Sequence, residues 1–199
     1  MSDRILSLPI TAQSLQLATT PQLLHTTAMK HLPQMGGMSS AIRADTATLL
    51  RLDLPSDPLG RPGRITLRLR GPAIDQALEP VETLPLVDGS RLVLRVAASA
   101  RARDQDDKIV YKPLSDDRFE ATITRQLRVA GMEPADLAFS PAKRFGQPGN
   151  GQVWLTVRDI TTTITLTDPA LAEAAHATGI GRGRAYGLGM PVVVANPTH

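Results

Sequence analysis

Four histidines are the side chains of this chain that are best suited to moving protons near neutral pH. They are His25, His31, His176 and His199. Imidazole has an unperturbed pKa of about 6.5, so it can serve either as a base or as an acid. His199 is the last residue, where chain order is usually poor, and His176 lies near a glycine-rich segment, where either a structural role or an RNA contact is open.

His25 has the most favourable local setting of the four. Thr20 followed by Pro21 is typical of a helix start, so His25 falls in the first turns of the helix that this signal predicts. It lies beside an apolar stripe on that helix, and the positive end of the helix dipole favours a neutral, basic imidazole there. His31 is the reserve candidate, six residues further on and on a different part of the helix surface.

A second chemically suggestive segment covers residues 179–189, in which five of eleven residues are glycine. Glycines let a backbone approach a ligand closely and let amides converge on an anion, and Arg182 and Arg184 add positive charge. A dinucleotide-binding motif needs a strand before it and a helix after it, whereas here the predicted order is reversed; a P-loop lacks its Gly-Lys-Ser/Thr. The alternative is a flexible loop, which the entropic cost of five glycines disfavours. The glycines are Gly179, Gly181, Gly183, Gly187 and Gly189.

Further positive charge follows the helix that Ser115 is predicted to begin. Arg118, Arg125 and Arg128 project within about 80° of one another at 100° per residue, on the side opposite the apolar stripe. Lys143 and Arg144 stand beside the turn of a predicted hairpin, where side chains can reach into an RNA groove. A-form RNA hides its bases in a deep major groove, so such contacts read shape and phosphates. For the helix, an ordinary solvated face is the alternative.

Overall composition supports these features without deciding between them. The 22 basic residues against 19 acidic ones give a net charge of +3, and the pI is about 9.7. Almost all of the basic residues are arginine, which suits phosphate and base stacking better than lysine, although codon usage also enriches arginine. The absence of cysteine excludes disulfides, thiolate zinc sites and cysteine nucleophiles. No long apolar run or signal-peptide pattern is present, so a cytoplasmic location is expected.

The order of predicted elements is strand, helix, strand, strand, helix, strand, and it occurs twice. The first set comprises residues 4–10, 21–32, 50–54, 65–70, a short helical piece at 73–78 and a strand at 81–86. At 50–54 leucine alternates with Arg51 and Asp53, which predicts a half-buried strand. The second set comprises 92–96, a charged segment at 99–112, a helix that begins at 115 and ends just before Gly131, strands at 137–140 and 153–166, a helix at 169–178 and a strand at 191–195. This is the ferredoxin-like pattern, so we expect an α+β fold with two domains at residues 1–88 and 89–199.

With these elements in place, the sequence Gly-Ile-Gly-Arg-Gly-Arg-Ala-Tyr-Gly-Leu-Gly-Met after a short helix resembles the glycine-rich loop of the CRISPR-associated repeat-processing endoribonucleases. More specifically, the chain resembles the type I-E member of this family, often called CasE, of the Cascade assembly. Support comes from the strand after Arg91, the Lys-Pro-Leu at Lys112, the arginine-bearing helix and the threonines before Asp168-Pro169. The likeness spans nearly the whole chain in the order of its elements.

The resemblance implies tandem ferredoxin-like (RRM-like) domains with an RNA-binding cleft between them. It implies a metal-independent endoribonuclease, without a cofactor, that binds CRISPR repeat hairpin RNA and cuts at the 3′ base of the stem. The 2′-hydroxyl of the scissile nucleotide attacks its own phosphate and leaves a 2′,3′-cyclic phosphate. The protein then stays on the mature guide RNA and joins other subunits of a Cascade-type effector complex.

The same resemblance assigns roles to particular residues. The Leu24-His25 pair occupies the place of the family's catalytic histidine, and Lys30 is a candidate for stabilising phosphate charge. Some relatives carry a Tyr where this chain has Gln22, so the second proton-transfer group is not identified, and neither Tyr186 nor Ser40 can be promoted to it. The expected RNA-binding residues are Lys112, Arg118, Arg125, Arg128, Lys143, Arg144, Arg182 and Arg184, together with the five glycines of the loop. A non-catalytic RNA-binding subunit and an ordinary α+β protein are the competing interpretations.

Overall fold

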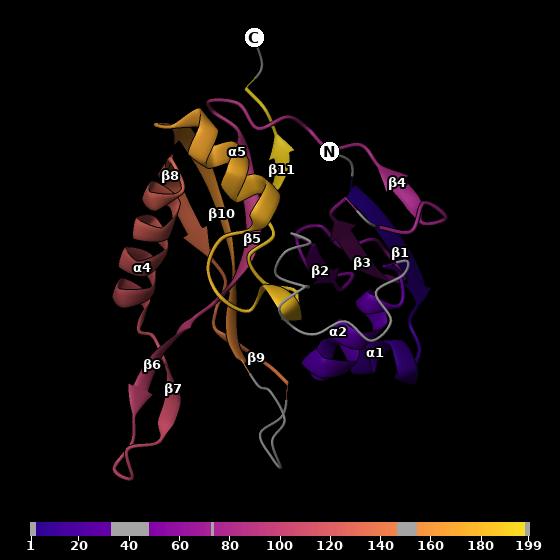
Figure 1. Cartoon of the computed structure of the whole chain (residues 1–199), viewed down its shortest axis with the longest axis horizontal. Helices are drawn as coiled ribbons and strands as arrows, with labels where there is room; N and C mark the ends of the chain where they lie inside the picture. Colours follow the sequence, from indigo (N-terminus) through magenta and orange to yellow (C-terminus); the bar gives the residue numbers. More distant parts are fainter. Residues whose placement is uncertain (1–2, 33–47, 73, 147–154, 198–199) are drawn as a thin grey trace.

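The computed structural model describes residues 3–32, 48–72, 74–146 and 155–197. Two antiparallel sheets lie side by side, each with helices packed against it (Figure 1). In the first sheet the strands run in the order β2-β3-β1-β4. Their bounds are β1 Asp3–Pro9, β2 Leu49–Asp53, β3 Arg64–Arg70 and β4 Glu79–Val81.

The second sheet repeats the connectivity of the first. Its order is β11-β5-β10-β8, with β9 added beside β10. In chain order, the first and third strands of each sheet (β1 and β3, β5 and β10) lie in the centre, and the second and fourth (β2 and β4, β8 and β11) lie at the edges. This is the ferredoxin-like arrangement. The expected tandem α+β fold is therefore confirmed, while the boundary after residue 88 stays a prediction. The bounds are β5 Arg91–Ala97, β8 Met132–Phe139, β9 Lys143–Phe145, β10 Leu155–Leu166 and β11 Val192–Ala195.

The helices begin where local chemistry satisfies their free backbone amides. The Thr11 side chain accepts a hydrogen bond from Ser14 N at 3.1 Å, and the Ser14 hydroxyl accepts one from Thr11 N at 2.9 Å, which is a capping box. Asp168 caps the last helix by accepting from Leu171 N at 3.1 Å. The bounds are α1 Ala12–Thr19, α2 Pro21–Met29, α4 Asp116–Val129, α5 Pro169–Thr178 and the 3₁₀ turn η1 Arg184–Tyr186.

Each sheet has its own apolar core, built from the stripes that the sequence predicts. The stripe of α2, with Leu24 and Ala28, packs in the same buried cluster as β3. Phe119 and Ile123 of α4 are buried with the inward side chains of β5 and β10. A smaller cluster of Leu49, Met190 and Val192 joins β2 to the end of the chain, so the two sheets are in apolar contact.

The structure also corrects several expected elements. The helix α1 was missed, so His25 lies on the second helix of the chain and not on the first. The short helix expected over residues 73–78 is a turn from residue 74 onward, and residue 73 lies outside the described part. Ile74 and Leu78 are both buried there. A turn can place two apolar residues four apart on the same side of the chain, as one turn of a helix does, so the spacing alone did not distinguish the two. The strand expected at 81–86 lies instead at Glu79–Val81.

The charged segment over residues 99–112 is a two-stranded hairpin formed by β6 (Ser99–Arg103) and β7 (Ile109–Pro113). It extends beyond α4 and away from the body of the molecule (Figure 1). A ribbon that is largely in water needs no alternation of apolar and polar residues, so the period-2 pattern used to predict the other strands is missing here.

Candidate functional site

The structure brings His25 into contact with the glycine-rich loop. His25 Nδ1 lies 2.8 Å from the carbonyl oxygen of Ala185, although 160 residues separate the two in sequence. The ring of Tyr186 meets the imidazole edge-on, with centroids 6.2 Å apart and planes at 64°. The two pieces singled out in the sequence, the imidazole of α2 and the loop at residues 179–189, therefore form one site.

The glycine-rich loop is held by a set of hydrogen bonds. Ile180 N donates to Gly189 O at 2.8 Å, and Gly189 N donates to Arg95 O of β5 at 2.7 Å. Arg184 Nη1 donates to Thr178 O at 2.8 Å, which closes the loop onto α5. All five glycines of the loop have positive φ, a region that other residues rarely adopt. The loop therefore has a defined backbone path.

A pocket of about 130 Å³ opens beside this contact, between the two sheets. One side is apolar and comes from α2 and β2, and the other side comes from β5, β9 and β10. Lys143 and Arg144 of β9 are exposed at this pocket, as the predicted hairpin position requires. Leu24, the neighbour of His25, and Tyr186 both contribute to its wall, so the pocket and the imidazole share a boundary. Its lining residues include Leu24, Leu52, Leu54, Asp57, Arg95, Lys143, Arg144, Phe145, Tyr186 and Gly187.

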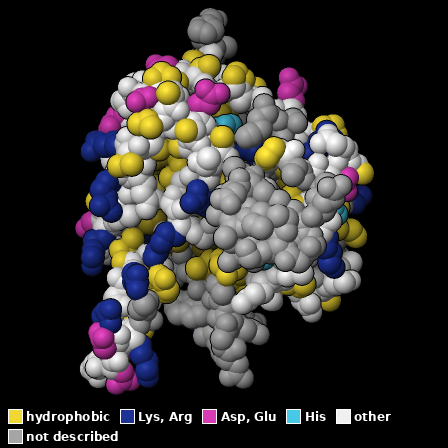
Figure 2. Space-filling model, viewed as in Figure 1, with side chains coloured by type: hydrophobic (Ala, Val, Ile, Leu, Met, Phe, Trp, Pro, Cys, Tyr) yellow, Lys and Arg dark blue, Asp and Glu magenta, His cyan; other side chains and the backbone are white. Residues whose placement is uncertain are grey.

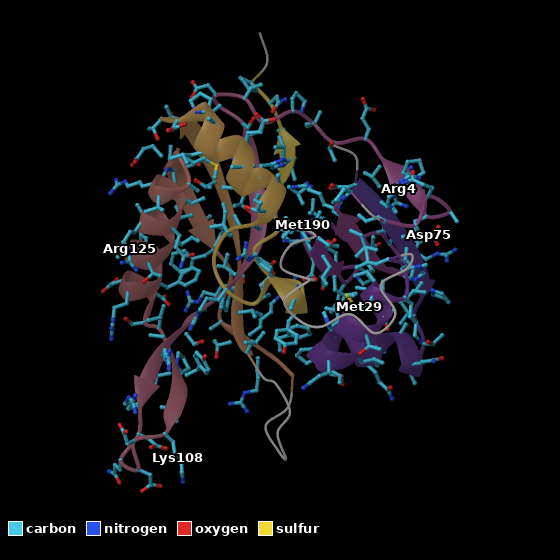
Figure 3. All side chains as sticks on the ribbon, in the orientation of Figure 1. Arg4, Met29, Asp75, Lys108, Arg125 and Met190 are labelled. Atoms are coloured by element: carbon cyan, nitrogen blue, oxygen red, sulfur yellow. The ribbon has the colours of Figure 1, made fainter. Side chains whose placement is uncertain are left out.

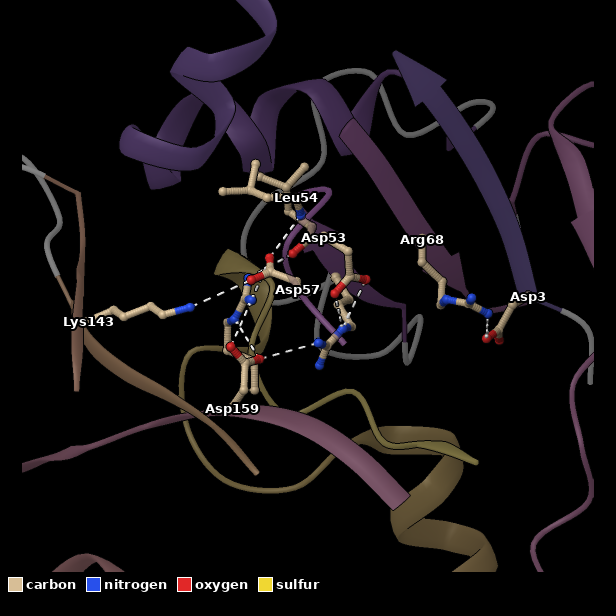
Figure 4. A network of polar contacts seen from close by, with 10 residues as sticks. Asp3, Asp53, Leu54, Asp57, Arg68, Lys143 and Asp159 are labelled. Atoms are coloured by element: carbon tan, nitrogen blue, oxygen red, sulfur yellow. Dashed lines mark hydrogen bonds and ion pairs between the residues drawn. The ribbon is translucent and has the colours of Figure 1, made fainter. Parts of the chain in front are cut away.

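Beneath the pocket, a network of buried ion pairs joins the two sheets (Figure 4). Asp159 of β10 accepts from Arg51 of β2 at 3.3 Å and from Arg95 of β5 at 3.0 Å. Arg95 also pairs with Asp57 at 2.9 Å, and Lys143 Nζ lies 3.7 Å from the same carboxylate. Arg51 is 0% exposed, so these charges form an internal polar contact between the sheets.

This network was not predicted. The alternation of leucine with Arg51 and Asp53 indicated a strand with one solvated face, but every residue of β2 is buried. The expected half-buried strand is wrong because the second face of β2 meets the carboxylate of Asp159 and not water. The pairing of Arg51 with Asp159 spans 108 residues, so it cannot be predicted from a local pattern.

The ionisation states of the network follow from its geometry. Burial opposes the charge of Asp57, yet Arg95 and the amide of Leu54 outweigh it and hold the pKa of Asp57 below its usual value. For Asp53, burial outweighs the attraction of Arg51 and raises the pKa. Burial alone would lower the pKa of Arg95, but Asp159 and Asp57 raise it overall. Arg95 and Asp57 therefore stay charged near neutral pH.

A second cavity, a groove of about 330 Å³, lies between α4, the base of the β6–β7 hairpin and the glycine-rich loop. Arg118 and Arg125 of α4 line it together with Arg182 of the loop. Neither Arg118 nor Arg125 forms an ion pair with another residue in the described ranges. Arg182 stacks over the Tyr111 ring at 5.1 Å and donates to the Ser99 carbonyl. We call this surface the arginine groove.

The arginine groove belongs to a larger basic face. Lys and Arg side chains gather over α4 and along the β6–β7 hairpin (Figure 2). Arg125 projects outward from α4, and Lys108 lies at the tip of the hairpin (Figure 3). The net charge of the chain is only +3. This face is suited to a polyanion because the positive side chains are concentrated on it.

Comparison of the whole chain with solved structures finds matches over nearly its full length. Cse3 of Thermus thermophilus, bound to an RNA representing a pre-cleavage complex, matches with a TM-score of 0.68 at 18% identity, covering 98% of this chain and all of that one. Cas6e of Escherichia coli K-12 matches with a TM-score of 0.65 at 15% identity, covering 97% and 98%. The chain has the fold of these CRISPR-associated proteins, of which Cse3 is a CRISPR endoribonuclease.

A chain of a CRISPR RNA-guided surveillance complex shares the Cse3 fold as well, with a TM-score of 0.62 at 16% identity and coverage of 98% and 100%. No family model and no curated protein matches the sequence itself. The resemblance drawn from the glycine-rich loop is thus confirmed at the level of the fold, although the sequences have diverged far.

Within this Cse3-like fold, not every residue expected at the site lies there. Lys30 is exposed and follows the last turn of α2, and five residues at 100° each turn it by about 140° from His25. Arg128 is engaged by Glu133 in two hydrogen bonds of 2.7 Å. Arg184 donates to the carbonyl of Thr178, the last residue of α5. Lys112 is exposed on β7 of the hairpin.

His176 has a structural position in the Cse3-like fold. Burial and the neighbouring Arg70 lower the pKa of His176 to about 4, so its ring is neutral at pH 7. Arg70 Nη1 donates to its Nε2 at 3.2 Å and to the His176 carbonyl at 2.9 Å. A neutral, bonded imidazole adds no charge for RNA. Ser40 and His199 lie outside the described residues.

Two further findings concern the described ranges alone. There, no group of three or more His, Asp or Glu side chains is arranged so that it could hold a metal ion. No helix among them combines the length and the apolar character needed to cross a membrane.

Proposed function

We propose that this protein is a metal-independent endoribonuclease that binds the hairpin of a CRISPR repeat RNA and cuts it at the 3′ base of the stem. The contact between His25 and the glycine-rich loop, beside a basic pocket, carries the proposal. The fold supports it, because it is shared along the whole chain with Cse3, an endoribonuclease solved with RNA bound. Cutting then yields the mature guide RNA.

The chemistry follows from one imidazole and nearby positive charge. The 2′-oxygen of the scissile nucleotide attacks the adjacent phosphorus while His25 takes its proton. The bond from phosphorus to the 5′-oxygen breaks, which leaves a 2′,3′-cyclic phosphate and a 5′-hydroxyl that gains its proton from solvent. Lys143 and Arg144, exposed at the pocket, offset the charge that builds on the phosphate. Gln22 supplies no second titrating group, so a single histidine and positioning carry the reaction.

The RNA stem lies along the arginine groove and the basic hairpin in this proposal. Arginine forks bind phosphate oxygens in two-pronged geometry, and A-form RNA presents its backbone more readily than its bases. A product held by many such contacts leaves slowly, so the protein stays on the cut RNA. We place it in the cytoplasm with other subunits of a Cascade-type complex, as one structural neighbour belongs to a surveillance complex.

Cleavage of a repeat hairpin in EDTA tests the proposal directly. We expect one discrete product that ends in a 2′,3′-cyclic phosphate, because the attacking group is part of the RNA and no metal is needed. A 2′-deoxy substitution at the scissile nucleotide should abolish cleavage and leave binding intact. Gel analysis with end-group mapping reports both results.

The cleavage assay, together with RNA binding measured at several salt concentrations, separates the competing functions. Tight, salt-sensitive binding with no product would identify a non-catalytic RNA-binding subunit of a CRISPR effector complex. Weak binding with a flat dependence on salt would identify an α+β protein without an RNA function, because phosphate contacts release counterions and give a steep slope.

The arginine groove provides a prediction on binding. Joint replacement of Arg118 and Arg125 by alanine should weaken hairpin binding and reduce the slope of log affinity against log salt by about 2, because each guanidinium neutralises one phosphate. Filter binding at several salt concentrations measures this slope. Arg128→Ala is the matched control, since it removes one charge from the same helix but one already paired with Glu133. An equal reduction of slope per charge in the control would contradict the placement of the RNA.

A further inference from the structure

The contact between His25 and Ala185 determines where the imidazole proton lies. A backbone carbonyl oxygen can only accept a hydrogen bond, so His25 Nδ1, at 2.8 Å from Ala185 O, must be the nitrogen that donates. In a neutral ring only one nitrogen carries hydrogen. Nε2 is then the nitrogen without hydrogen, and it is the one able to take a proton.

We propose that the carbonyl of Ala185 is a positioning group that holds His25 in the tautomer with a basic Nε2. The inference rests on the proposed function, since it assigns the loop a task in that reaction. Without a partner, an imidazole side chain exchanges between its two tautomers and rotates about its side-chain bonds. The carbonyl removes both freedoms, and it also stabilises the imidazolium that forms once Nε2 has taken the proton, because Nδ1–H remains bonded to a partly negative oxygen.

The position of that carbonyl is set by the glycines on either side of it. The 3₁₀ turn η1, which contains Ala185, runs between Gly183 and Gly187, and both have left-handed backbone angles, with φ of 79° and 85°. Gly187 lies against α2: a Cβ placed there would come within 3.2 Å of Leu24 Cδ2 and 3.1 Å of Leu50 Cδ1. Leu24 precedes His25 on α2, so the contact at Gly187 fixes the position of the turn relative to the helix that carries the imidazole.

The rest of the loop is tied to β5 and to the base of the β6–β7 hairpin. Gly189 bonds the backbone of Arg95, and Arg182 reaches the Ser99 carbonyl. Tyr186 lies edge-on to the imidazole, with ring centroids 6.2 Å apart, and so limits the space in which the ring can rotate. The loop glycines thus serve to aim a backbone carbonyl at the catalytic base, a task distinct from binding phosphate with their amides.

Imidazole nitrogen NMR tests the tautomer without any RNA. The ¹⁵N-labelled protein is measured by long-range proton–nitrogen correlation at a pH where His25 is neutral, and the His25 signals are assigned by their absence in His25→Gln. We expect Nδ1 to be the protonated nitrogen. His176 is an internal reference, because Arg70 donates to its Nε2 and so requires the same tautomer. A protonated Nε2 in His25, or an average of both forms, overturns the inference.

A loop variant then connects the tautomer with the reaction. Gly187→Ala places a methyl group against Leu24 and Leu50 and strains the backbone, so it should displace η1. We expect mixing of the His25 tautomers and cleavage slower by roughly 100-fold, the cost of a displacement of about 1 Å at a reacting group, with RNA affinity within about threefold. The matched control is Gly63→Ala, which strains a backbone of φ 68° but meets no atom within 4 Å; it should retain both the tautomer and the rate.

The outcomes separate this inference from the proposed function. Wild-type tautomer and wild-type rate in Gly187→Ala would refute the positioning role while leaving the nuclease intact. A decrease in affinity equal to the decrease in rate would show that the loop binds RNA and does not position the base. Cleavage undiminished in His25→Gln would refute the role of His25 in the reaction, whatever the tautomer found by NMR.

Discussion

Replacement of His25 by alanine is expected to slow cleavage of the repeat hairpin by roughly 10²–10⁴-fold, the usual contribution of a general acid–base group. The imidazole is the titrating side chain that the structure places against the glycine-rich loop, and the apolar side of α2 does not depend on it because His25 lies beside the buried stripe. Affinity for the RNA should therefore change little. Single-turnover rates with excess protein measure the chemical step even if the product stays bound.

The control for this prediction is His31→Ala, in the turn that follows α2. His31 lies six residues after His25, past the end of the helix, and its backbone carbonyl accepts from Asp75 N at 2.9 Å. Its alanine variant should cleave at the wild-type rate. Undiminished cleavage by His25→Ala, or equal losses in the two variants, would remove His25 from the catalytic role.

Local periodicity was sufficient to predict most of the fold. The apolar stripes of α2 and α4, the Pro and Asp signals at helix starts, and the alternation in β3 and β5 each depend on neighbours within a few residues. Those neighbours determine which face is buried, so the order of elements and the duplicated α+β arrangement followed from them. The missed helix α1 has only Leu17 and Ser14 buried, which leaves no stripe long enough to predict it.

The features that escaped prediction depend on partners far away in the chain. The arginines and aspartates of β2 resemble an exposed face until Asp159 and Arg95 are placed opposite them. Likewise, Arg118 lines the arginine groove with Arg182 of the distant glycine-rich loop. The pairing of Arg128 with Glu133, five residues further on, is local, but the periodicity of the helix did not indicate it. His25 could be proposed from its helix position and the resemblance, but its contact with Ala185 spans 160 residues and required the fold.

The buried network gives the second large effect. Its charges are balanced, three cations with three carboxylates: Arg51, Arg95 and Lys143 with Asp53, Asp57 and Asp159. Asp159→Asn should lower the free energy of unfolding by about 3–5 kcal/mol, because Arg51 and Arg95 keep only Asp53 and Asp57 as partners and the cluster is left with one uncompensated positive charge. The isosteric amide keeps the volume of the side chain, so a cavity contributes little to this decrease.

Guanidinium unfolding followed by circular dichroism measures the change as a lower midpoint at constant slope. The control is Glu79→Gln, which neutralises a carboxylate paired with Arg61 at 3.1 Å but about half exposed. Exposed pairs contribute about 0–1 kcal/mol, so this variant should resemble wild type. Because Asp159 links β10 to Arg51 of the other sheet, its replacement should also loosen the pocket at Lys143. Equal, small changes in the two variants would show that the sheets are held together by their apolar contacts and not by these charges.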